Sequence, residues 1–265
     1  MEDVQARPDD RGVVIQQAGV SELMVPITVL DRTHGKQQTI ARMSMSVGIP
    51  HHFKGTHMSR FIEVIEEHRG EVTMRTLPVI LAELRRRLDA ETARIELEFP
   101  YFIERAAPVT GARALMDVRC AFMGEVTAVG DDFLLTVTVP VTSLCPCSKT
   151  ISDYGAHNQR TAVTMQVRTV ARAFSAEAIL WIEDLVEVAD GASSCPVYPL
   201  LKRADERHVT MQAFDNPKFV EDIVRDVALA LRDDSRVRWF KARARSDESI
   251  HNHCAFAEVE WTRGE

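Results

Sequence analysis

The alternation of apolar and polar residues predicts a protein rich in long antiparallel strands. Glu22–Arg32 and Lys36–Gly48 alternate in this way, and Thr33-His34-Gly35 joins them as a hairpin turn. Further alternating segments are Arg94–Glu104, Arg113–Thr127, Asp132–Thr142, Arg160–Val170, Arg236–Arg245 and His253–Thr262. Short connections join most of these segments in pairs, so sequential antiparallel pairing is favoured over a parallel sheet.

Other segments carry apolar residues at helical spacing. These helices are expected from about Met58, from Leu77, over Ala176–Ala189 and after Asn216-Pro217. Thr76 is placed to cap the second helix, and Pro78 lies in its first turn, where proline is tolerated. Asn216 is placed to cap the last helix. The order strand, strand, helix, helix, strand, strand therefore occurs twice along the chain.

This repetition predicts an α+β protein of two tandem units, each a four-stranded antiparallel sheet with two helices. The first unit is expected over residues 19–129 and the second over 130–265. Residues 1–18 are expected to be a disordered lead, because the segment is polar and lacks the apolar stretch of a signal peptide. Sheet edges left open by each unit favour pairing between units or between chains.

Composition narrows the possible function classes. The formal net charge of the 265 residues is −7, which disfavours a general nucleic-acid binder. No run of about 18 apolar residues occurs, so we expect no membrane helix and a cytoplasmic protein. Five cysteines is an odd number, and without an export signal thiols or metal ligands are favoured over disulfides.

The densest group of reactive residues lies in one expected hairpin loop. Cys145 and Cys147 follow the end of a strand, and His157 comes shortly before the next strand begins. The loop can therefore fold His157 back onto the cysteines. Thiolate and imidazole are preferred ligands of zinc-like metals, although Cys-x-Cys also fits an ordinary pair of thiols.

A carboxylate in a second loop could complete a metal site. Glu206 ends the segment Cys195–Glu206, whose two prolines exclude a regular helix at its start. A Cys–His–carboxylate set leaves a fourth position for water, which is the catalytic form of such a site. The alternative is that Glu206 belongs to a solvated run of charges.

The last hairpin loop also combines a carboxylate with imidazoles. Glu248 precedes His251 and His253, which lie two residues apart and so share one face of an extended chain. Such a set suits proton transfer or metal ligation. A polar turn with solvated histidines is the simpler alternative.

Two further features suit an anionic, guanine-like ligand. Four basic residues precede or open the first helix, where phosphate binds well: His52, Lys54, His57 and Arg60. Glu221 lies one step off an apolar helical stripe, and its carboxylate could accept hydrogen bonds from paired ring N–H and amino groups. An acidic residue favoured by the helix dipole also explains Glu221.

Taken together, five segments resemble the type IB GTP cyclohydrolases, and they occur in the family's order. They are FKGTHMSRF at Phe53–Phe61, LCPCSKTISDYGAHNQR at Leu144–Arg160, CPVYPLLKRADE at Cys195–Glu206, NPKFVEDIVRD at Asn216–Asp226 and ESIHNH at Glu248–His253. The resemblance implies tandem tunnelling-fold (T-fold) units and a homotetramer. It also implies a hydrolase that converts GTP and water to 7,8-dihydroneopterin triphosphate and formate. This is the first step of tetrahydrofolate synthesis, and deazaguanine synthesis is left open as a second destination.

The resemblance also assigns roles to residues. It implies that Cys145, His157 and Glu206 hold a divalent metal (Zn, Mn or Fe), which activates the water that attacks C8 of guanine. It places Glu248, His251 and His253 around the reacting ring, as catalytic residues with Cys145 and His157. It makes Glu221 the anchor of the purine. We expect His52, Lys54, His57 and Arg60 to hold the triphosphate.

Two other functions remain open at this point. Nitrile reductases of deazaguanine synthesis share the fold and use a reactive cysteine, but they need NADPH, and no nicotinamide-binding motif is found in this sequence. A metal-storage or metal-sensing protein would use the Cys and His loops without any turnover. That reading leaves Glu221 and the basic segment unexplained.

Overall fold

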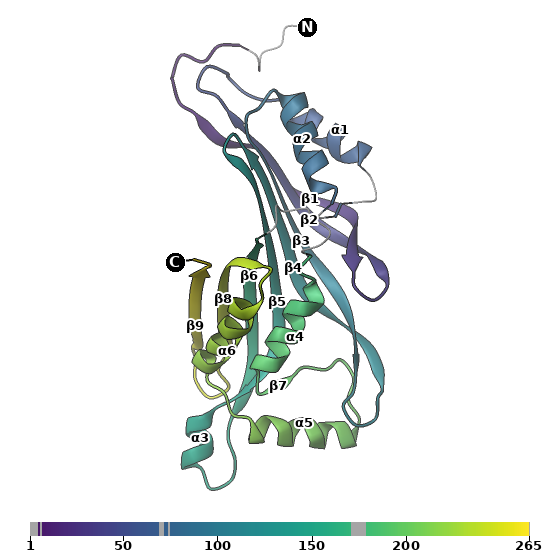
Figure 1. Cartoon of the computed structure of the whole chain (residues 1–265), viewed down its shortest axis with the longest axis vertical. Coiled ribbons are helices and arrows are strands. Elements are labelled where there is room, and N and C mark those ends of the chain that lie inside the picture. The colour runs from purple at the N-terminus through teal and green to yellow at the C-terminus, as the bar shows by residue number, and fades with distance from the viewer. Residues whose placement is uncertain (1–4, 6, 69–71, 74, 171–178, 265) are drawn as a thin grey trace. The chain divides into compact units, whose positions relative to one another are not determined.

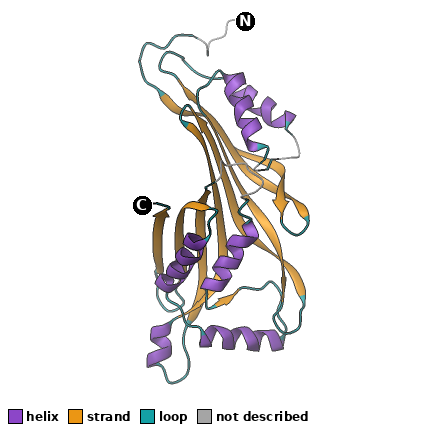
Figure 2. Ribbon diagram, in the orientation of Figure 1, coloured by secondary structure: helices purple, strands orange, loops and turns teal. Residues whose placement is uncertain are grey.

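The computed structural model describes residues 5, 7–68, 72–73, 75–170 and 179–264 (Figure 1). The strands of this part of the chain are β1 Ile15–Asp31, β2 Gly35–Ile49, β3 Ala93–Ala106, β4 Arg113–Thr127, β5 Gly130–Leu144, β6 Asn158–Thr169, β7 Cys195–Pro196, β8 Val237–Asp247 and β9 Cys254–Thr262. They form a nine-stranded sheet of order β1-β2-β3-β4-β5-β6-β8-β9, with β7 paired to β5. Figure 2 shows these strands in orange and the helices in purple.

The helices of the described residues are fewer in the first half of the chain than in the second. They are α1 Met58–Glu67, α2 Leu77–Leu88, α3 Pro146–Ile151, α4 Ile182–Ala192, α5 Arg203–Asp215 and α6 Val220–Asp233. The prediction of an α+β protein built on antiparallel strands is confirmed, whereas the expected four-stranded sheets are replaced among the described residues by one sheet of nine strands. No helix in the described part of the chain is long and apolar enough to cross a membrane.

The chain divides into two compact units that are each discontinuous in sequence. Unit 1 takes the described residues up to Pro100 and Ala121–Leu134, and unit 2 takes Tyr101–Cys120, Leu135–Val170 and the described residues from Ile179. Strands β3, β4 and β5 therefore contribute residues to both units. The expected division into halves at residues 129 and 130 stays a prediction.

Unit 1 contains the first predicted hairpin and the first two helices. Asp31 closes the β1–β2 turn, because its Oδ1 accepts the backbone N–H groups of Thr33 at 2.8 Å and His34 at 2.7 Å. Strand β1 begins at Ile15, so positions 15–18 of the expected disordered lead are extended strand. Residues 1–4 and 6 of that lead lie outside the described residues.

The predicted cap of α2 is wrong in its chemistry. The helix begins at Leu77 and Pro78 lies in its first turn, as expected, but the Thr76 side chain makes no capping hydrogen bond. Its Oγ1 instead accepts the backbone N–H of Thr73 at 2.8 Å, in the turn that precedes the helix. The apolar stripe therefore determines the start of α2, through the fully buried Leu77, Ile80 and Leu84.

In unit 2, helices α4 and α6 lie side by side on one face of the sheet, and α6 packs on β8 and β9 (Figure 1). The stripe of α6 is buried as predicted, through Ile223, Val227 and Leu231. The expected helix over Ala176–Ala189 corresponds to α4, which begins at Ile182; positions 176–178 lie outside the described residues.

The predicted cap of α6 is also wrong. Phe219 is the N-cap residue, and its N–H donates to Oδ2 of Asp222 at 3.1 Å. Asn216 instead ends α5, and its Nδ2 donates to the carbonyl of Ser193 at 2.8 Å. The Asn-Pro pair marked a real boundary between helices, but the asparagine belongs to the helix before it.

Helix α5 has no counterpart among the expected elements, because it lacks an apolar stripe. Its buried residues are only Asp205 and Ala213. Asp205 is fully buried and joins the start of α5 to the tip of the β3–β4 hairpin. Its carboxylate accepts the N–H groups of Val109, Thr110 and Lys202 at 2.8, 2.8 and 2.9 Å, and the Thr110 hydroxyl at 2.7 Å.

These contacts determine the charge state of Asp205. Burial opposes ionisation, but the Thr110 side chain and the three backbone N–H groups outweigh it and hold the pKa of Asp205 well below its usual range. The carboxylate is therefore a charged link between a hairpin and a helix that would otherwise make few apolar contacts.

We predict that Asp205→Asn lowers the free energy of unfolding at pH 7, because an amide offers one acceptor oxygen to four donors. A lowered folded-state pKa stabilises the fold above the ordinary pKa of about 3.9 and loses this contribution as pH falls through the lowered pKa. Denaturant unfolding at pH 7 and pH 3 should therefore show a smaller difference between variant and wild type at pH 3. The control is Asp215→Asn at the C-terminal end of the same helix, where loss of a negative charge should leave stability unchanged or slightly raised. Equal effects of the two variants would contradict the prediction.

Candidate functional site

The pairing of β5 with β6 brings Cys145 and His157 together. Leu144 and Asn158 are register partners, so the loop between them leaves and returns at one point of the sheet. The N–H of Cys145 donates to the carbonyl of His157 at 3.1 Å. Both residues are half-buried. The predicted folding of His157 back onto the cysteine loop is confirmed at the level of the backbone.

A short helix inside this loop holds Cys145 in place. Cys145 is the N-cap residue of α3, and its Sγ accepts the N–H of Ser148 at 3.4 Å. The Ser148 hydroxyl donates to the Cys145 carbonyl and accepts the N–H of His157 at 3.2 Å. Ser148 therefore links the two residues a second time. Cys147 is exposed and has no such contact with the loop.

The imidazole of His157 is fixed from one side. Its Nδ1 lies 2.9 Å from Oε1 of Gln159, two residues along β6. The other ring nitrogen, Nε2, is therefore the atom that remains for a ligand. A thiol and an imidazole on one half-buried loop are the donor types that zinc-like metals prefer, so the pair fits as two of three metal ligands.

Glu206 is not gathered with this pair. It is exposed in the first turn of α5. Lys149 of α3 contacts the other end of that helix, where its Nζ lies 4.3 Å from the ring centroid of Phe214. Eight residues of helix separate Glu206 from Phe214, which is about 12 Å along the axis. Among the described residues, no group of three or more His, Cys, Asp or Glu is placed to hold a metal ion.

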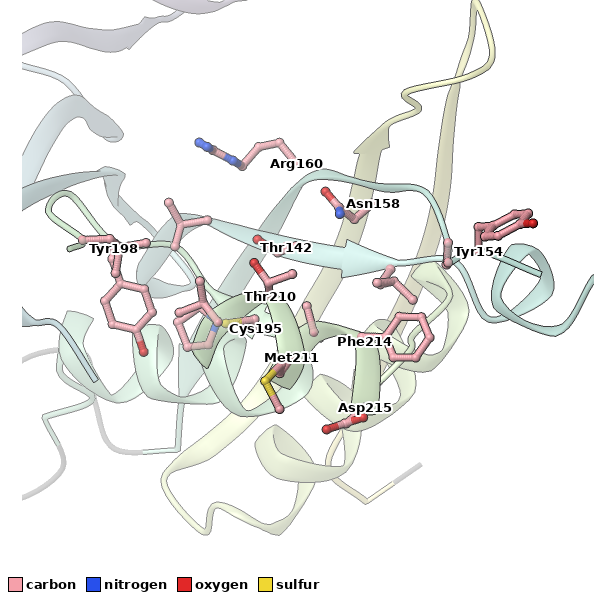
Figure 3. A pocket seen from close by; sticks show the side chains of 18 of the residues that line it. Thr142, Tyr154, Asn158, Arg160, Cys195, Tyr198, Thr210, Met211, Phe214 and Asp215 are labelled. Carbon is pink, nitrogen blue, oxygen red and sulfur yellow. The ribbon is translucent and has the colours of Figure 1, made fainter. Parts of the chain in front are cut away.

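A pocket of about 920 Å³ opens beside the Cys145–His157 loop (Figure 3). Its walls come from the loop before β6, the β7 segment and α5. Tyr154 and Tyr198 lie at opposite ends, with Cys195, Thr210 and Met211 between them (Figure 3). Ala156 and Asn158, the neighbours of His157, also line it. The volume is within the range of small-molecule sites.

Most residues of this pocket are not predicted by the sequence patterns. Thr210, Met211 and Phe214 belong to α5, which the apolar pattern does not reveal. Tyr198 belongs to the Cys195–Glu206 segment, in which the residue pattern points to Glu206 as the functional candidate. The apolar and aromatic residues that follow Cys195-Pro196, Tyr198 above all, are the available signal for the pocket.

A largely buried ion pair lies near the Tyr198 end of the pocket, where the Arg105 guanidinium is 6.0 Å from the centre of the Tyr198 ring. Arg105 at the end of β3 binds both carboxylate oxygens of Asp190 on α4, at 2.9 and 2.8 Å. Burial raises the pKa of Asp190 despite this pairing. Burial, and then the charge of Asp190, raises the pKa of the Cys195 thiol to about 11. Cys195 is thus a neutral thiol in the pocket wall.

The Glu248–His253 loop joins β8 to β9 at the same end of the strands as the Cys145–His157 loop. Thr161 of β6 and Ser246 of β8 are register partners, so the end of β8 lies beside the start of β6. The exposed rings of His251 and His253 stack with centroids 5.1 Å apart and planes 12° from parallel. The structure thus brings these two imidazoles together, as their spacing predicts.

Glu221 is exposed in the first turn of α6. The segment that leads into this helix is tied to the start of the Cys145–His157 loop, because the N–H of Lys218 donates to the Leu144 carbonyl at 3.0 Å. The helix start and Cys145 are therefore anchored to adjacent points of β5.

The four basic candidates belong to unit 1. His52 is exposed and His57 is the N-cap residue of α1. Lys54 is also exposed, on a loop whose backbone pairs with residues before β1. Arg60 has a structural contact: its Nη1 donates to the Arg87 carbonyl at the end of α2, at 2.8 Å. The guanidinium of Arg60 is therefore directed toward the end of α2.

Known proteins match this chain over nearly its whole length. Residues 1–257 match the family described as type I GTP cyclohydrolase folE2. The chain belongs to this family. It is 48% identical to the GTP cyclohydrolase FolE2 of Nitrosococcus oceani over 260 residues, covering 98% of this chain and 95% of the relative. Identity to the GTP cyclohydrolase FolE2 of Geobacter sulfurreducens is 50% over 260 residues, or 98% of each chain.

Solved structures of similar fold include urate oxidases, which have the tunnelling fold. A hyperthermostable mutant of the Bacillus sp. TB-90 enzyme has a TM-score of 0.55 at 9% identity, covering 94% of this chain and 99% of the other. The Bacillus subtilis 168 enzyme gives a TM-score of 0.55 at 8% identity over the same shares. At such low identity the likeness concerns the fold alone.

We predict that iodoacetamide at about pH 8 alkylates Cys147 in the folded protein and leaves Cys195 and Cys120 unmodified. Burial raises the pKa of both protected thiols, so only about one Cys195 in a thousand is thiolate at that pH. Peptide mass spectrometry after a timed reaction measures each site, and unfolding in denaturant should make the three react alike. Modification of Cys195 in the folded protein as fast as Cys147 would contradict the assignment of its surroundings.

Proposed function

We propose that this protein is a GTP cyclohydrolase that converts GTP and water to 7,8-dihydroneopterin triphosphate and formate. The observation that carries the proposal is the match of residues 1–257 to the family, together with the pairing of Cys145 and His157 in the folded chain. The relatives named above cover nearly the whole chain at about half identity. The pocket beside His157 supports a small-molecule substrate.

Cys145, His157 and Glu206 are proposed to hold a divalent metal: Zn, Mn or Fe. Bound there, a divalent cation supplies Lewis acidity and lowers the pKa of a coordinated water. The half-buried loop provides one thiol and one imidazole in fixed positions. A three-ligand site requires Glu206 to approach them from the first turn of α5.

The remaining candidates are proposed to bind and protonate the substrate. Glu221 accepts hydrogen bonds from the N–H and amino groups of guanine, as a carboxylate does with paired donors. Glu248, His251 and His253 move protons while the imidazole ring opens and formate leaves. This role is supported by the pairing of β5, β6 and β8, because their loops leave the sheet at the same end of these strands. His52, Lys54, His57 and Arg60 are proposed to bind the triphosphate, and for Arg60 this requires release from the Arg87 carbonyl.

The wider setting is also a proposal. A homotetramer in the cytoplasm, with tandem T-fold units in each chain, agrees with the family resemblance. Strands β1 and β9 end the strand order, and such edges favour pairing with further chains. The product enters tetrahydrofolate synthesis, with deazaguanine synthesis as a second destination.

The direct test is turnover by metal-stripped protein. We expect formate and the fluorescence of oxidised neopterin from GTP only after Mn²⁺, Zn²⁺ or Fe²⁺ is added, and none of this to need NADPH. Folded, metal-loaded protein that yields neither product would overturn the proposed function and favour a metal-storage role. Product formation that depends on NADPH would favour a reductase.

We predict that Cys145→Ala loses both the bound metal and turnover, because it removes a ligand. Cys147→Ala is the matched variant, two residues away in the same loop and exposed. It should retain metal by elemental analysis and turn over GTP. Wild-type turnover by Cys145→Ala with metal retained would refute Cys145 as a ligand.

We predict that Glu221→Gln weakens GTP binding, because an amide oxygen is a poorer acceptor for the guanine donors than a carboxylate. Each lost charged hydrogen bond is worth about 1.5–3 kcal/mol, or roughly a 10- to 100-fold rise in KM. Glu221→Gln should bind GTP more weakly by titration calorimetry, whereas Arg225→Gln on the next turn of α6 should not. Equal affinity in wild type and Glu221→Gln would mean that the carboxylate does not bind guanine and only interacts with the helix dipole.

A further inference from the structure

Beneath His157, four polar side chains form a chain of hydrogen bonds across β5, β6 and β8. The Nε2 group of Gln159 donates to Ser143 Oγ at 3.1 Å, and Ser143 Oγ lies 2.8 Å from Thr161 Oγ1. Thr161 Oγ1 donates to Ser246 Oγ at 3.1 Å. Ser143, Thr161 and Ser246 are almost fully buried, with exposed fractions of 1%, 0% and 0%.

The direction of each hydrogen bond follows from the number of protons available. Thr161 has one hydroxyl proton and gives it to Ser246, so in the 2.8 Å contact Ser143 is the donor to Thr161. Ser143 then has no proton left and accepts from the amide of Gln159.

The amide orientation determines the protonation of the imidazole. With its NH₂ group on Ser143, Gln159 presents Oε1 to His157 Nδ1 at 2.9 Å. A carbonyl oxygen only accepts, so Nδ1 carries the proton. The neutral ring then has its lone pair on Nε2, the nitrogen that points away from Gln159.

We propose that Gln159 is a positioning residue that, through Ser143, Thr161 and Ser246, holds His157 in the Nδ1–H tautomer with Nε2 ready to bind a metal. The inference rests on the proposed function only in taking His157 as a metal ligand. A hydrogen-bond partner on the opposite ring nitrogen orients a ligating histidine and makes it more basic.

The network differs from an ordinary cross-strand contact of the same sheet. Thr138 and Thr164 also pair through their hydroxyl groups, at 3.0 Å, on the same two strands β5 and β6. That pair is half-buried and lies in the middle of the two strands, six register steps from the Leu144–Asn158 pair where the Cys145–His157 loop begins. Thr138→Ala therefore removes a β5–β6 hydroxyl pair without touching His157, and it is the matched control.

The first experiment reads the tautomer directly in metal-free protein. Histidine labelled with ¹⁵N is observed by NMR at about pH 8, above the ordinary imidazole pKa of about 6.5, and the His157 signals are assigned by their loss in His157→Asn. We expect a protonated Nδ1 in the wild type and in Thr138→Ala. Gln159→Leu, which leaves Nδ1 without its acceptor, should give a mixture of tautomers. A wild-type signal with the proton on Nε2 would overturn the proposal.

The second experiment measures metal affinity by competition with a chelator, using Zn²⁺ or Mn²⁺ alone. We expect Gln159→Leu to bind about 10- to 100-fold more weakly. Gln159→Glu keeps an acceptor oxygen on Nδ1 and should restore most of the affinity. Ser143→Ala should lie between Gln159→Leu and the wild type, while Thr138→Ala should equal the wild type.

These measurements separate the role of Gln159 as a positioning residue from the role of His157 as a metal ligand. Metal binding that needs His157 and is unchanged in Gln159→Leu overturns the role of Gln159 and leaves the proposed function standing. Metal binding that does not need His157 refutes that histidine as a ligand, and the role of Gln159 falls with it. Circular dichroism of each variant keeps an unfolded protein from being counted as a loss of affinity, and Gln159→Glu supplies the result where Gln159→Leu does not fold.

Discussion

The site depends first on the register between β5 and β6. Because Leu144 lies opposite Asn158, the residues between them form a closed loop whose two ends, Cys145 and His157, are neighbours. A slip of one residue would put Ser143 and Gln159, which are register partners, on opposite faces of the sheet, and Cys145 would no longer meet His157. The register is held by a ladder of buried apolar residues such as Val137 and Val139. Packing in the core thus fixes the positions of polar groups at the strand ends.

How much the sequence predicts depends on which force forms each element. Alternating apolar residues predict β4 to the residue, as Arg113–Thr127, because burial of one face alone fixes that strand. Helix α5 escapes prediction because a carboxylate, Asp205, fixes its start and no apolar stripe runs along it. A buried charge that is held by backbone N–H groups leaves no periodic trace in the sequence.

The same contrast applies to the candidate site. Cys145 and His157 meet because they flank one hairpin, which a sequence can reveal. Glu206 comes from another element, and its distance from the pair depends on how α5 crosses the ends of the strands. The pocket residues Thr210 and Met211 belong to that helix as well, and no local pattern reports them. Family resemblance supplies the roles that local patterns cannot, and the urate oxidases show that the fold alone would not.

The clamp on Asp205 has a consequence for the β3–β4 hairpin. Two adjacent N–H groups, of Val109 and Thr110, converge on one carboxylate oxygen, and the neighbouring residue of that carboxylate is Glu206. A change of one residue in the length of the turn would break this convergence, even though the sheet itself would tolerate it. The length of a surface turn is therefore constrained by the helix that it holds, and relatives of this chain should vary in the composition of the turn far more than in its length.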